Sequence, residues 1–340
     1  MPMNRKDDHI NSALSQKSQD NHFDHVRFIH HALSDLTTDD IDLSAFLGGK
    51  KFPLPFFINA MTGGTQQAYE INEKLALLAK HFSIPMALGS ISSAIKDATW
   101  EATYKIARKA NPNGTLIANL GAEVSKETVL KAINMIDADM LQIHLNNVQE
   151  IVMPEGDRNF KAHAETIQAL ASSLTIPLII KEVGFGMASE TLQRLKSLGV
   201  KHIDVAGKGG TNFSIIENER RQSPFAFFNT WGLSTVESLL EAKRETSLNI
   251  IASGGIRDGL DIIKALRLGA SFVGMSGYFL KLVKNNTLEE AIEEVDRLIE
   301  SLKGIMTVLN AQSIKDLKDI PIVFSTEITH YMKQRNILFK

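Results

Sequence analysis

The sequence contains no cysteine, which excludes a disulfide framework, a thiolate zinc site, an iron–sulfur cluster and a cysteine nucleophile. It also lacks an excess of charge, because 37 basic and 39 acidic residues leave a net charge of −2. Such a weak field gives no reason to expect non-specific nucleic-acid binding. No apolar run approaches the roughly 20 residues of a membrane span. Residues 1–20 mix both charge signs without the apolar core of a secretory signal. We therefore expect a cytoplasmic protein with neither nucleic-acid nor membrane partners.

Eight short apolar runs alternate with amphipathic stretches along most of the 340 residues. The runs are residues 55–61, 85–88, 115–120, 140–145, 177–183, 202–206, 249–253 and 271–275. The stretches, which predict helices, include residues 68–81, 126–136, 190–198, 235–245 and 259–268. Continuously apolar strands alternating with helices are typical of a parallel sheet covered on both faces. An open doubly wound sheet is the alternative, but eight even units favour an α/β fold closed as a (β/α)8 TIM barrel.

The two ends of the chain lie outside this pattern. Residues 1–50 are polar and then helical or irregular, and residues 285–340 predict helices with one extended piece bounded by Pro321. We therefore expect a single barrel domain over 1–340, with an N-terminal extension at 1–50 and a C-terminal helical cap at 285–340. The polar stretch 208–224 is long for a connection between a strand and a helix, which makes it a candidate lid.

The fourth apolar run carries the most informative polar residues. Because side chains alternate between two faces of a strand, Gln142, His144 and Asn146 share one face, which we place in the barrel lumen. Burying three such groups is costly unless they have partners, so they surround either a polar ligand or a structural hydrogen-bond network. Gln149 and Glu150 follow directly, and a single carboxylate is enough to hold Mg²⁺ together with water and substrate phosphate.

Lys181 interrupts the fifth apolar run, and a buried lysine needs an anionic partner or a lowered pKa. Glu182 is adjacent, but neighbouring residues of a strand point to opposite faces. We therefore predict that Lys181 faces a ligand.

Glycine-rich turns follow several of the predicted strands. Residues 59–65 end the first run with small residues that allow either close approach of a planar ligand or a plain turn. Residues 252–259 and 274–277 follow the seventh and eighth runs, where many barrels bind phosphate. Arg257 can add a forked charge contact, so these turns predict a cofactor that bears phosphate.

Taken together, these motifs resemble the type 2 isopentenyl-diphosphate isomerases, a family of FMN-dependent (β/α)8 barrels. The resemblance runs from about Asn4 to Phe324 and is most specific in the motifs 4–10 and 144–150. Further matching motifs are residues 59–64, 118–121, 181–186, 204–211 and 253–257.

The resemblance assigns residues to each part of the site. Those implied to hold the flavin ring and ribityl chain are Ala60, Met61, Thr62, Ser90, Asn119, Lys181 and Thr211. Those implied to hold its phosphate are Gly255, Ile256, Arg257, Ser276 and Gly277. Those implied to meet the isoprenoid diphosphate are Arg5, Lys6, His144, Asn146 and Gln149, and Glu150 is implied to hold Mg²⁺. The chain lacks the arginine that many members have after Ser90, so Ser92, Ser93 or Lys96 is expected to replace it.

The reaction implied is the interconversion of isopentenyl and dimethylallyl diphosphate by a 1,3-proton shift in isoprenoid biosynthesis. It needs reduced FMN, with NADPH as the reductant, and Mg²⁺. Our hypothesis gives proton transfer to the flavin near N5, with Gln149 and His144 positioning substrate or relaying protons, and Lys181 near N1 favouring the anionic ring. We also expect a homo-oligomer. The alternatives are an FMN-dependent oxidoreductase of the 2-hydroxy-acid type, which needs a histidine base before the phosphate turn, and a non-catalytic flavin-binding protein.

Overall fold

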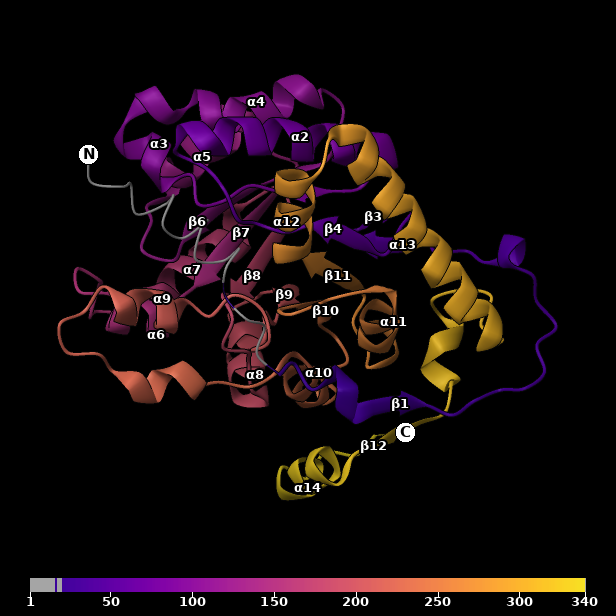
Figure 1. The fold of residues 1–340 in the computed structure, drawn as a ribbon. Coiled ribbons are helices and arrows are strands. Elements are labelled where there is room, and N and C mark those ends of the chain that lie inside the picture. The colour runs from indigo at the N-terminus through magenta and orange to yellow at the C-terminus, as the bar shows by residue number, and fades with distance from the viewer. Residues whose placement is uncertain (1–15, 17–19, 340) are drawn as a thin grey trace.

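The computed structural model describes residue 16 and residues 20–339, and its centre is a closed barrel of eight parallel strands (Figure 1). The strands are β4 (Phe56–Ile58), β5 (Met86–Ala87), β6 (Leu116–Gly121), β7 (Met140–Leu145), β8 (Leu178–Glu182), β9 (His202–Asp204), β10 (Asn249–Ser253) and β11 (Phe272–Met275). Each pairs with the next, and β11 pairs in parallel with β4 to close the ring. Every predicted apolar run overlaps one strand, so the TIM barrel is confirmed and the open sheet was wrong.

Strand alternation separates the interior into two cores. Side chains on the outer face, such as Leu141 and Ile143 of β7, join the large core between strands and helices. Side chains on the inner face near the amino ends of the strands, such as Phe57, Ile179 and Phe272, form a smaller core inside the lumen. The polar side chains that line the pocket lie above this apolar layer, at the carboxyl ends of the strands, where active sites of such barrels form.

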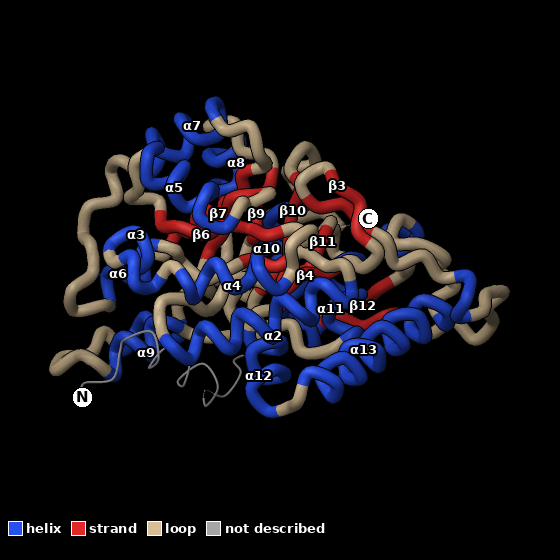
Figure 2. The backbone as a smooth tube through the Cα atoms, turned by 90° about the horizontal axis from the view of Figure 1, so that it is seen from above, coloured by secondary structure: helices blue, strands red, loops and turns tan. Residues whose placement is uncertain are grey.

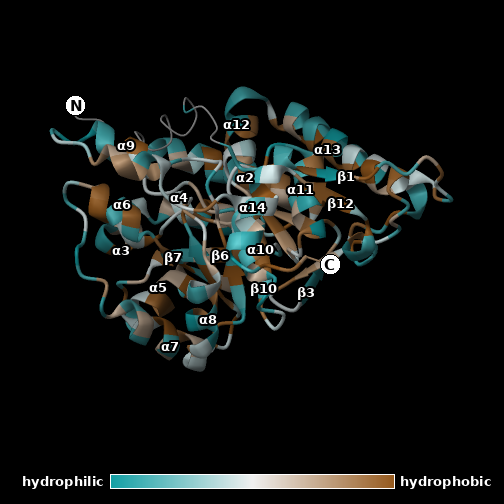
Figure 3. Cartoon of the chain, turned by 90° about the horizontal axis from the view of Figure 1, so that it is seen from below, coloured by the Kyte–Doolittle hydropathy of each residue, from teal (hydrophilic) through white to brown (hydrophobic). Residues whose placement is uncertain are grey.

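The barrel is surrounded by α2 (Gln66–Phe82), α4 (Ala102–Ala110), α5 (Lys126–Ile136), α7 (His163–Ser173), α8 (Ser189–Ser197), α10 (Thr235–Ala242) and α11 (Gly259–Arg267), as Figure 2 shows. The bounds of α5 are those predicted. The Ser125 hydroxyl accepts from the Thr128 amide at its start, and Asp137 ends it in a left-handed conformation. Val129, Ala132 and Ile136 form its buried face at helical spacing. The strands are predominantly hydrophobic, whereas the helices carry both kinds of residue (Figure 3).

Part of the N-terminal extension forms a hairpin of β2 (Ala45–Leu47) and β3 (Lys50–Phe52), so the expectation of helical or irregular structure was wrong there. Gly48 and Gly49 connect the strands with φ of 59° and 84°, a turn that favours glycine at both positions. Ala45, Leu47 and Phe52 pack on the apolar layer of the lumen. The hairpin therefore closes the barrel at the end opposite the polar layer.

The C-terminal part contains α13 (Leu288–Val308), β12 (Ile322–Phe324) and α14 (Thr326–Gln334). The extended piece predicted at Pro321 is β12, which pairs antiparallel with β1 (Val26–Phe28). Figure 1 shows β1, β12 and α14 together, below α10 and α11. Among the described residues, no helix is long and apolar enough to cross a membrane.

Candidate functional site

A pocket of about 790 Å³ lies at the carboxyl ends of the barrel strands. Small ligands and cofactors occupy pockets of about 300–1,000 Å³. All predicted site residues within the described chain line it: Ala60, Met61, Thr62, Ser90, Asn119, His144, Asn146, Gln149, Glu150, Lys181, Thr211, Gly255, Ile256, Arg257, Ser276 and Gly277. The structure thus brings together residues from every part of the barrel, while their individual roles stay predictions. Arg5 and Lys6 lie outside the described residues.

A directional chain of hydrogen bonds crosses the lumen below the pocket. It begins at the buried Asp204 carboxylate, which accepts from Asn59 Nδ2 at 2.7 Å. Asn59 Oδ1 accepts from Gln142 Nε2 at 3.1 Å, and Gln142 Oε1 accepts from Asn119 Nδ2 at 3.3 Å. Asn119 Oδ1 then meets His144 Nδ1 at 2.7 Å. For Gln142, which is fully buried, the structural network is therefore the correct interpretation.

This chain fixes which nitrogen of His144 carries the proton. A carboxylate only accepts, so Asp204 orients the Asn59 amide, and the Ala60 backbone N–H donates to Asn59 Oδ1 in agreement. Each amide then orients the next, and Asn119 presents an oxygen to His144 Nδ1. Nδ1 must therefore be the protonated nitrogen, which leaves Nε2 as the one able to gain or lose a proton on the pocket side.

We expect His144 to stay neutral through the physiological pH range. Burial, with a smaller contribution from Lys181, lowers its pKa to about 4. An ¹⁵N NMR titration of the protein should show a neutral Nδ1–H imidazole from pH 8 down to about pH 5. A midpoint near the usual 6.5 would contradict this. Since the unfolded chain binds more protons between about pH 4 and 6.5, this group's contribution to stability falls as the pH is lowered through that window.

Lys181 lies in the lumen with the buried Asp204 as its ionic partner. Its Nζ is 3.7 Å from Asp204 Oδ2 and donates to the Glu182 carbonyl at 2.8 Å. The Glu182 carboxylate points away, as strand alternation predicted, and Glu182 Oε2 accepts from the backbone N–H groups of residues 183–185. The partner is thus on the neighbouring strand β9, a pairing that the sequence did not reveal.

The residues after β7 form a second polar network over the pocket. Asn146 Nδ2 donates to Glu150 Oε1 at 2.9 Å, and Glu150 Oε2 accepts from the Asp157 backbone N–H at 2.8 Å. Gln149 Nε2 donates to Glu217 Oε1 at 3.1 Å. Glu217 is fully buried and belongs to α9 (Phe213–Glu219), inside the segment predicted as a lid. In Figure 1, α9 lies beside α6 (Asn147–Val152). The predicted lid segment, residues 208–224, therefore holds the Gln149 side chain through Glu217.

The glycine turn after β10 has the geometry of an anion site. Gly254 and Gly255 have φ of 99° and 75°, and a Cβ on Gly255 would collide with the backbone of Gly209. Ser276 precedes α12 (Gly277–Asn285), whose first turn has no side-chain cap and begins at the pocket. Unpaired N–H groups at such a helix start attract phosphate.

Arg257 makes ion pairs that the sequence did not reveal. Its guanidinium makes forked contacts with two carboxylates, at 2.7 Å to both oxygens of Asp24 and at 2.8 and 3.0 Å to those of Asp261. The side chain therefore braces the glycine turn while Arg257 also lines the pocket, and its contact with phosphate stays a prediction. These paired carboxylates raise the pKa of Arg257.

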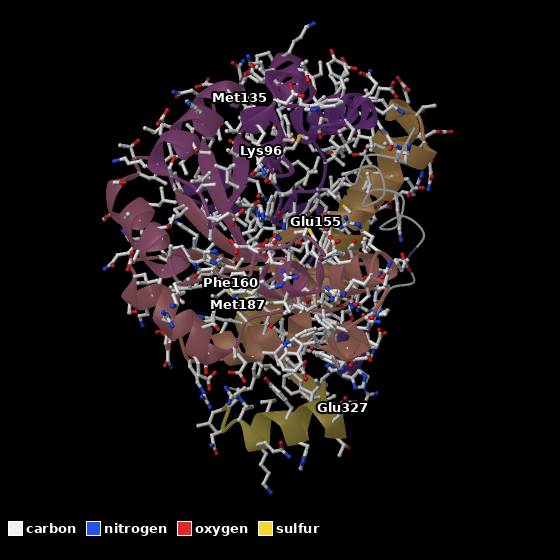
Figure 4. All side chains as sticks on the ribbon, turned by 90° about the vertical axis from the view of Figure 1, so that its left-hand side faces the viewer. Lys96, Met135, Glu155, Phe160, Met187 and Glu327 are labelled. Atoms are coloured by element: carbon white, nitrogen blue, oxygen red, sulfur yellow. The ribbon has the colours of Figure 1, made fainter. Side chains whose placement is uncertain are left out.

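Near Ser90 the structure separates the three possible replacements for the missing arginine. Ser92 and Lys96 line the pocket, and Ser92 Oγ lies 3.0 Å from Ser90 Oγ. Ser93 is not among the described residues that line the pocket, and its Oγ lies 2.8 Å from the Tyr104 hydroxyl. Lys96 is therefore the cation available on this side (Figure 4).

Sequence reasoning missed four residues that matter to the site. Asn59 and Asp204 were quoted only within motifs, although strand alternation could have placed both in the lumen. Tyr278 and Lys281 line the pocket from one face of α12, three residues apart, a spacing that could have found them.

Comparison with known proteins identifies a matching family model and full-length relatives. Residues 119–322, more than half of the chain, match the family model described as FMN-dependent dehydrogenase. The chain is 44% identical over 336 residues to isopentenyl-diphosphate delta-isomerase from Staphylococcus aureus strain Newman, covering 98% of this chain and 96% of that protein. The protein of the same name from strain JH9 matches with the same identity and coverage.

Solved structures with the same fold are more distant in sequence. The recombinant flavin-binding domain of baker's yeast flavocytochrome b2 superposes with a TM-score of 0.68 at 16% identity, covering 93% of this chain and 82% of that chain. A mandelate oxidase variant with 2-hydroxy-phenylacetamide superposes with a TM-score of 0.66 at 16% identity, covering 95% and 96%. At these identities the likeness shows the fold alone.

Proposed function

Because the chain belongs to the isopentenyl-diphosphate delta-isomerases, within the FMN-dependent dehydrogenase family, we propose that it interconverts isopentenyl and dimethylallyl diphosphate by a 1,3-proton shift. The observation that carries this proposal is the pocket itself. It places an anion-binding turn, a buried lysine and the cluster His144, Asn146, Gln149 and Glu150 around one cavity.

The residues of the pocket fit FMN. The turn at Gly255 and Ile256 and the start of α12 would hold its phosphate, and Lys181 would lie under the ring with residues 60–62 and Asn119. The reduced ring supplies an electron-rich surface that can carry a proton and stabilise positive charge on a five-carbon chain. Arg257 also holds the turn, through its contacts with Asp24 and Asp261.

The substrate contacts follow from which groups can donate. A diphosphate only accepts, so Lys96 and the Asn146 amide supply direct contacts, and Arg5 and Lys6 are proposed to add more. His144 carries its fixed proton on Nδ1 toward Asn119 and is neutral in the free protein, so it donates to substrate only if the diphosphate charge offsets the effect of burial and Nε2 takes up a proton. Gln149, held by Glu217, positions the chain, because a neutral amide is a poor acid or base.

Glu150 is proposed to hold Mg²⁺, which typically binds one or two carboxylates, waters and substrate phosphate. Replacing it in Glu150→Gln should raise the Mg²⁺ concentration for half-maximal activity by about 10–100-fold. Glu165→Gln, on the outer helix α7, is the matched control and should leave it unchanged. Equal Mg²⁺ dependence in Glu150→Gln and the unchanged protein would remove this assignment.

Several finer features complete the proposal. NADPH supplies the electrons that reduce FMN, the reaction serves isoprenoid biosynthesis, and the protein acts in the cytoplasm as a homo-oligomer. The family resemblance supports the reductant and the pathway, the absence of cysteine and the weak net charge support the location, and the tendency of such barrels to assemble supports the oligomer.

The match to the FMN-dependent dehydrogenase model raises one alternative, an oxidoreductase acting on 2-hydroxy acids. Such chemistry needs a histidine base before the phosphate turn, where this chain has Ser253, whose hydroxyl donates to Asp204. Among the described residues that line the pocket, His144 is the only histidine. The isomerase is therefore favoured.

One assay separates the three possibilities. FMN-loaded protein is incubated with isopentenyl diphosphate, Mg²⁺ and NADPH without oxygen, and the isomers are quantified. We expect the allylic isomer to form only when the flavin is reduced. Reduction of oxidised flavin by a 2-hydroxy acid would instead identify the oxidoreductase, and binding of isopentenyl diphosphate without turnover would identify a flavin-binding protein.

A further inference from the structure

A cluster of potential metal ligands lies outside the pocket, beside the C-terminal helix α14. Asp20, His22 and His25 each offer one ligand atom, and these atoms lie within 4.8 Å of one another. Asp20 Oδ2 is 3.4 Å from His25 Nε2 and 3.9 Å from His22 Nε2. In a tetrahedral site with metal–ligand bonds of about 2.0–2.2 Å, ligand atoms lie about 3.3–3.6 Å apart. The three residues are thus arranged close to the spacing of a bound ion.

Both imidazoles are also oriented for ligation. His22 Nδ1 lies 3.0 Å from Ser234 Oγ, and His25 Nδ1 lies 2.9 Å from Ser325 Oγ. These hydroxyls can accept from Nδ1–H, and each histidine then presents an unprotonated Nε2 toward Asp20. Hydrogen bonds to the other ring nitrogen are typical of histidines that ligate metals, because they fix the tautomer and the ring.

A second carboxylate approaches from the opposite end of the chain. Glu327 Oε1 on α14 is 3.7 Å from His22 Nε2 and its Oε2 is 3.7 Å from His25 Nδ1, so this carboxylate lies beside the group of three without sharing its ligand spacing. Figure 4 shows Glu327 well away from Lys96 and Glu155, which line the pocket. Two carboxylates and two imidazoles make a ligand set suited to Zn²⁺ or Co²⁺, whereas Mg²⁺ prefers oxygen ligands alone.

We propose that Asp20, His22 and His25 bind one divalent transition-metal ion of the Zn²⁺ type, and that Glu327 turns from its position beside both histidines to become the fourth ligand. The residues between these ligands face the phosphate turn: Asn21 Nδ2 donates to the Gly255 carbonyl at 2.6 Å, and Asp24 pairs with Arg257. The ion would therefore link residues 20–25, which support the glycine turn after β10, to helix α14. This proposal does not rest on the isomerase activity.

The test uses FMN-loaded protein freed of metal with EDTA and titrated with Zn²⁺ by calorimetry. We expect a site of one ion per chain and a higher Tm with Zn²⁺, because a ligand that binds only the folded state stabilises it. Co²⁺ should give the long-wavelength absorption of a tetrahedral site, beyond the flavin bands. His22→Ala and His25→Ala should each weaken Zn²⁺ binding by about 100-fold or more. His30→Ala, a nearby exposed histidine, is the matched control.

The variant Glu150→Gln separates this site from the proposed Mg²⁺ site, and it should keep both the Zn²⁺ affinity and the Tm increase. Absence of stoichiometric Zn²⁺ binding would overturn the proposal, as would equal affinity in the His22→Ala, His25→Ala double variant. Glu327→Gln is expected to weaken binding by about 10–100-fold, and an unchanged Kd would overturn its assignment as the fourth ligand.

Discussion

Replacing Lys181 by methionine is expected to lower kcat by about 10²–10³-fold, the effect typical of removing one preorganised electrostatic contact in a buried site. The Lys181 ammonium is buried at the pocket, hydrogen-bonded to the Glu182 carbonyl and 3.7 Å from Asp204 Oδ2, so water screens its charge only weakly. Methionine keeps a similar length without charge. The flavin midpoint potential should become more negative, because the reduced anionic ring loses its cation.

The control for this variant is Lys201→Met, which removes an exposed lysine just before β9 and should change neither kcat nor potential. A normal flavin spectrum would show that Lys181→Met still folds and binds FMN. If turnover and potential were both unchanged in that folded variant, the electrostatic role of Lys181 would be wrong.

Replacing Asp204 by asparagine is expected to move the ring proton of His144 from Nδ1 to Nε2 and to lower kcat/KM by about 10²-fold. Ser253 Oγ and the Ala206 backbone N–H both donate to Asp204 Oδ1, so asparagine would keep an oxygen there. It would then present N–H to Asn59, where the native chain needs an acceptor. Asn59 would then have to flip and lose the hydrogen bond that its Oδ1 accepts from the Ala60 N–H. Each later amide would follow, and His144 would end as the Nε2–H tautomer.

The tautomer can be measured directly from ¹⁵N NMR of His144, apart from any activity. Ser253→Ala removes another partner of Asp204 but leaves the carboxylate, so the Nδ1–H form should persist there. Gln142→Met interrupts the hydrogen-bond chain in its middle while Asp204 still pairs with Lys181. In this variant His144 should no longer be restricted to the Nδ1–H tautomer. An Nδ1–H imidazole in both Asp204→Asn and Gln142→Met would refute control of His144 by the chain.

Local patterns were enough to predict the barrel, because its strands are short apolar runs with helices of regular period between them. The same period-2 rule placed Gln142, His144 and Asn146 in the lumen and turned Glu182 away from Lys181. The hairpin β2–β3 was missed because each strand has three residues, too few to show a period, although Gly48-Gly49 is a turn signal.

The partner that a side chain contacts was less predictable from the sequence than the strand face on which the side chain lies. Arg257 pairs with Asp24, which is 233 residues away in sequence. Gln149 is held by Glu217, 68 residues further along, and Lys181 by Asp204 on the next strand. No local pattern encodes such pairs.

The sequence by itself determined which residues form strands, which side chains point inward, and where glycine allows the backbone to approach a phosphate. These properties depend on a few neighbouring residues and on steric rules of the backbone. Only the tertiary structure decided that Asp204, Asn59, Gln142, Asn119 and His144 form one directional chain, and that Asp20, His22 and His25 meet Glu327. Closure of the barrel and pairing of β1 with β12 bring these groups within hydrogen-bonding or ligand distance, and their chemistry depends on that proximity.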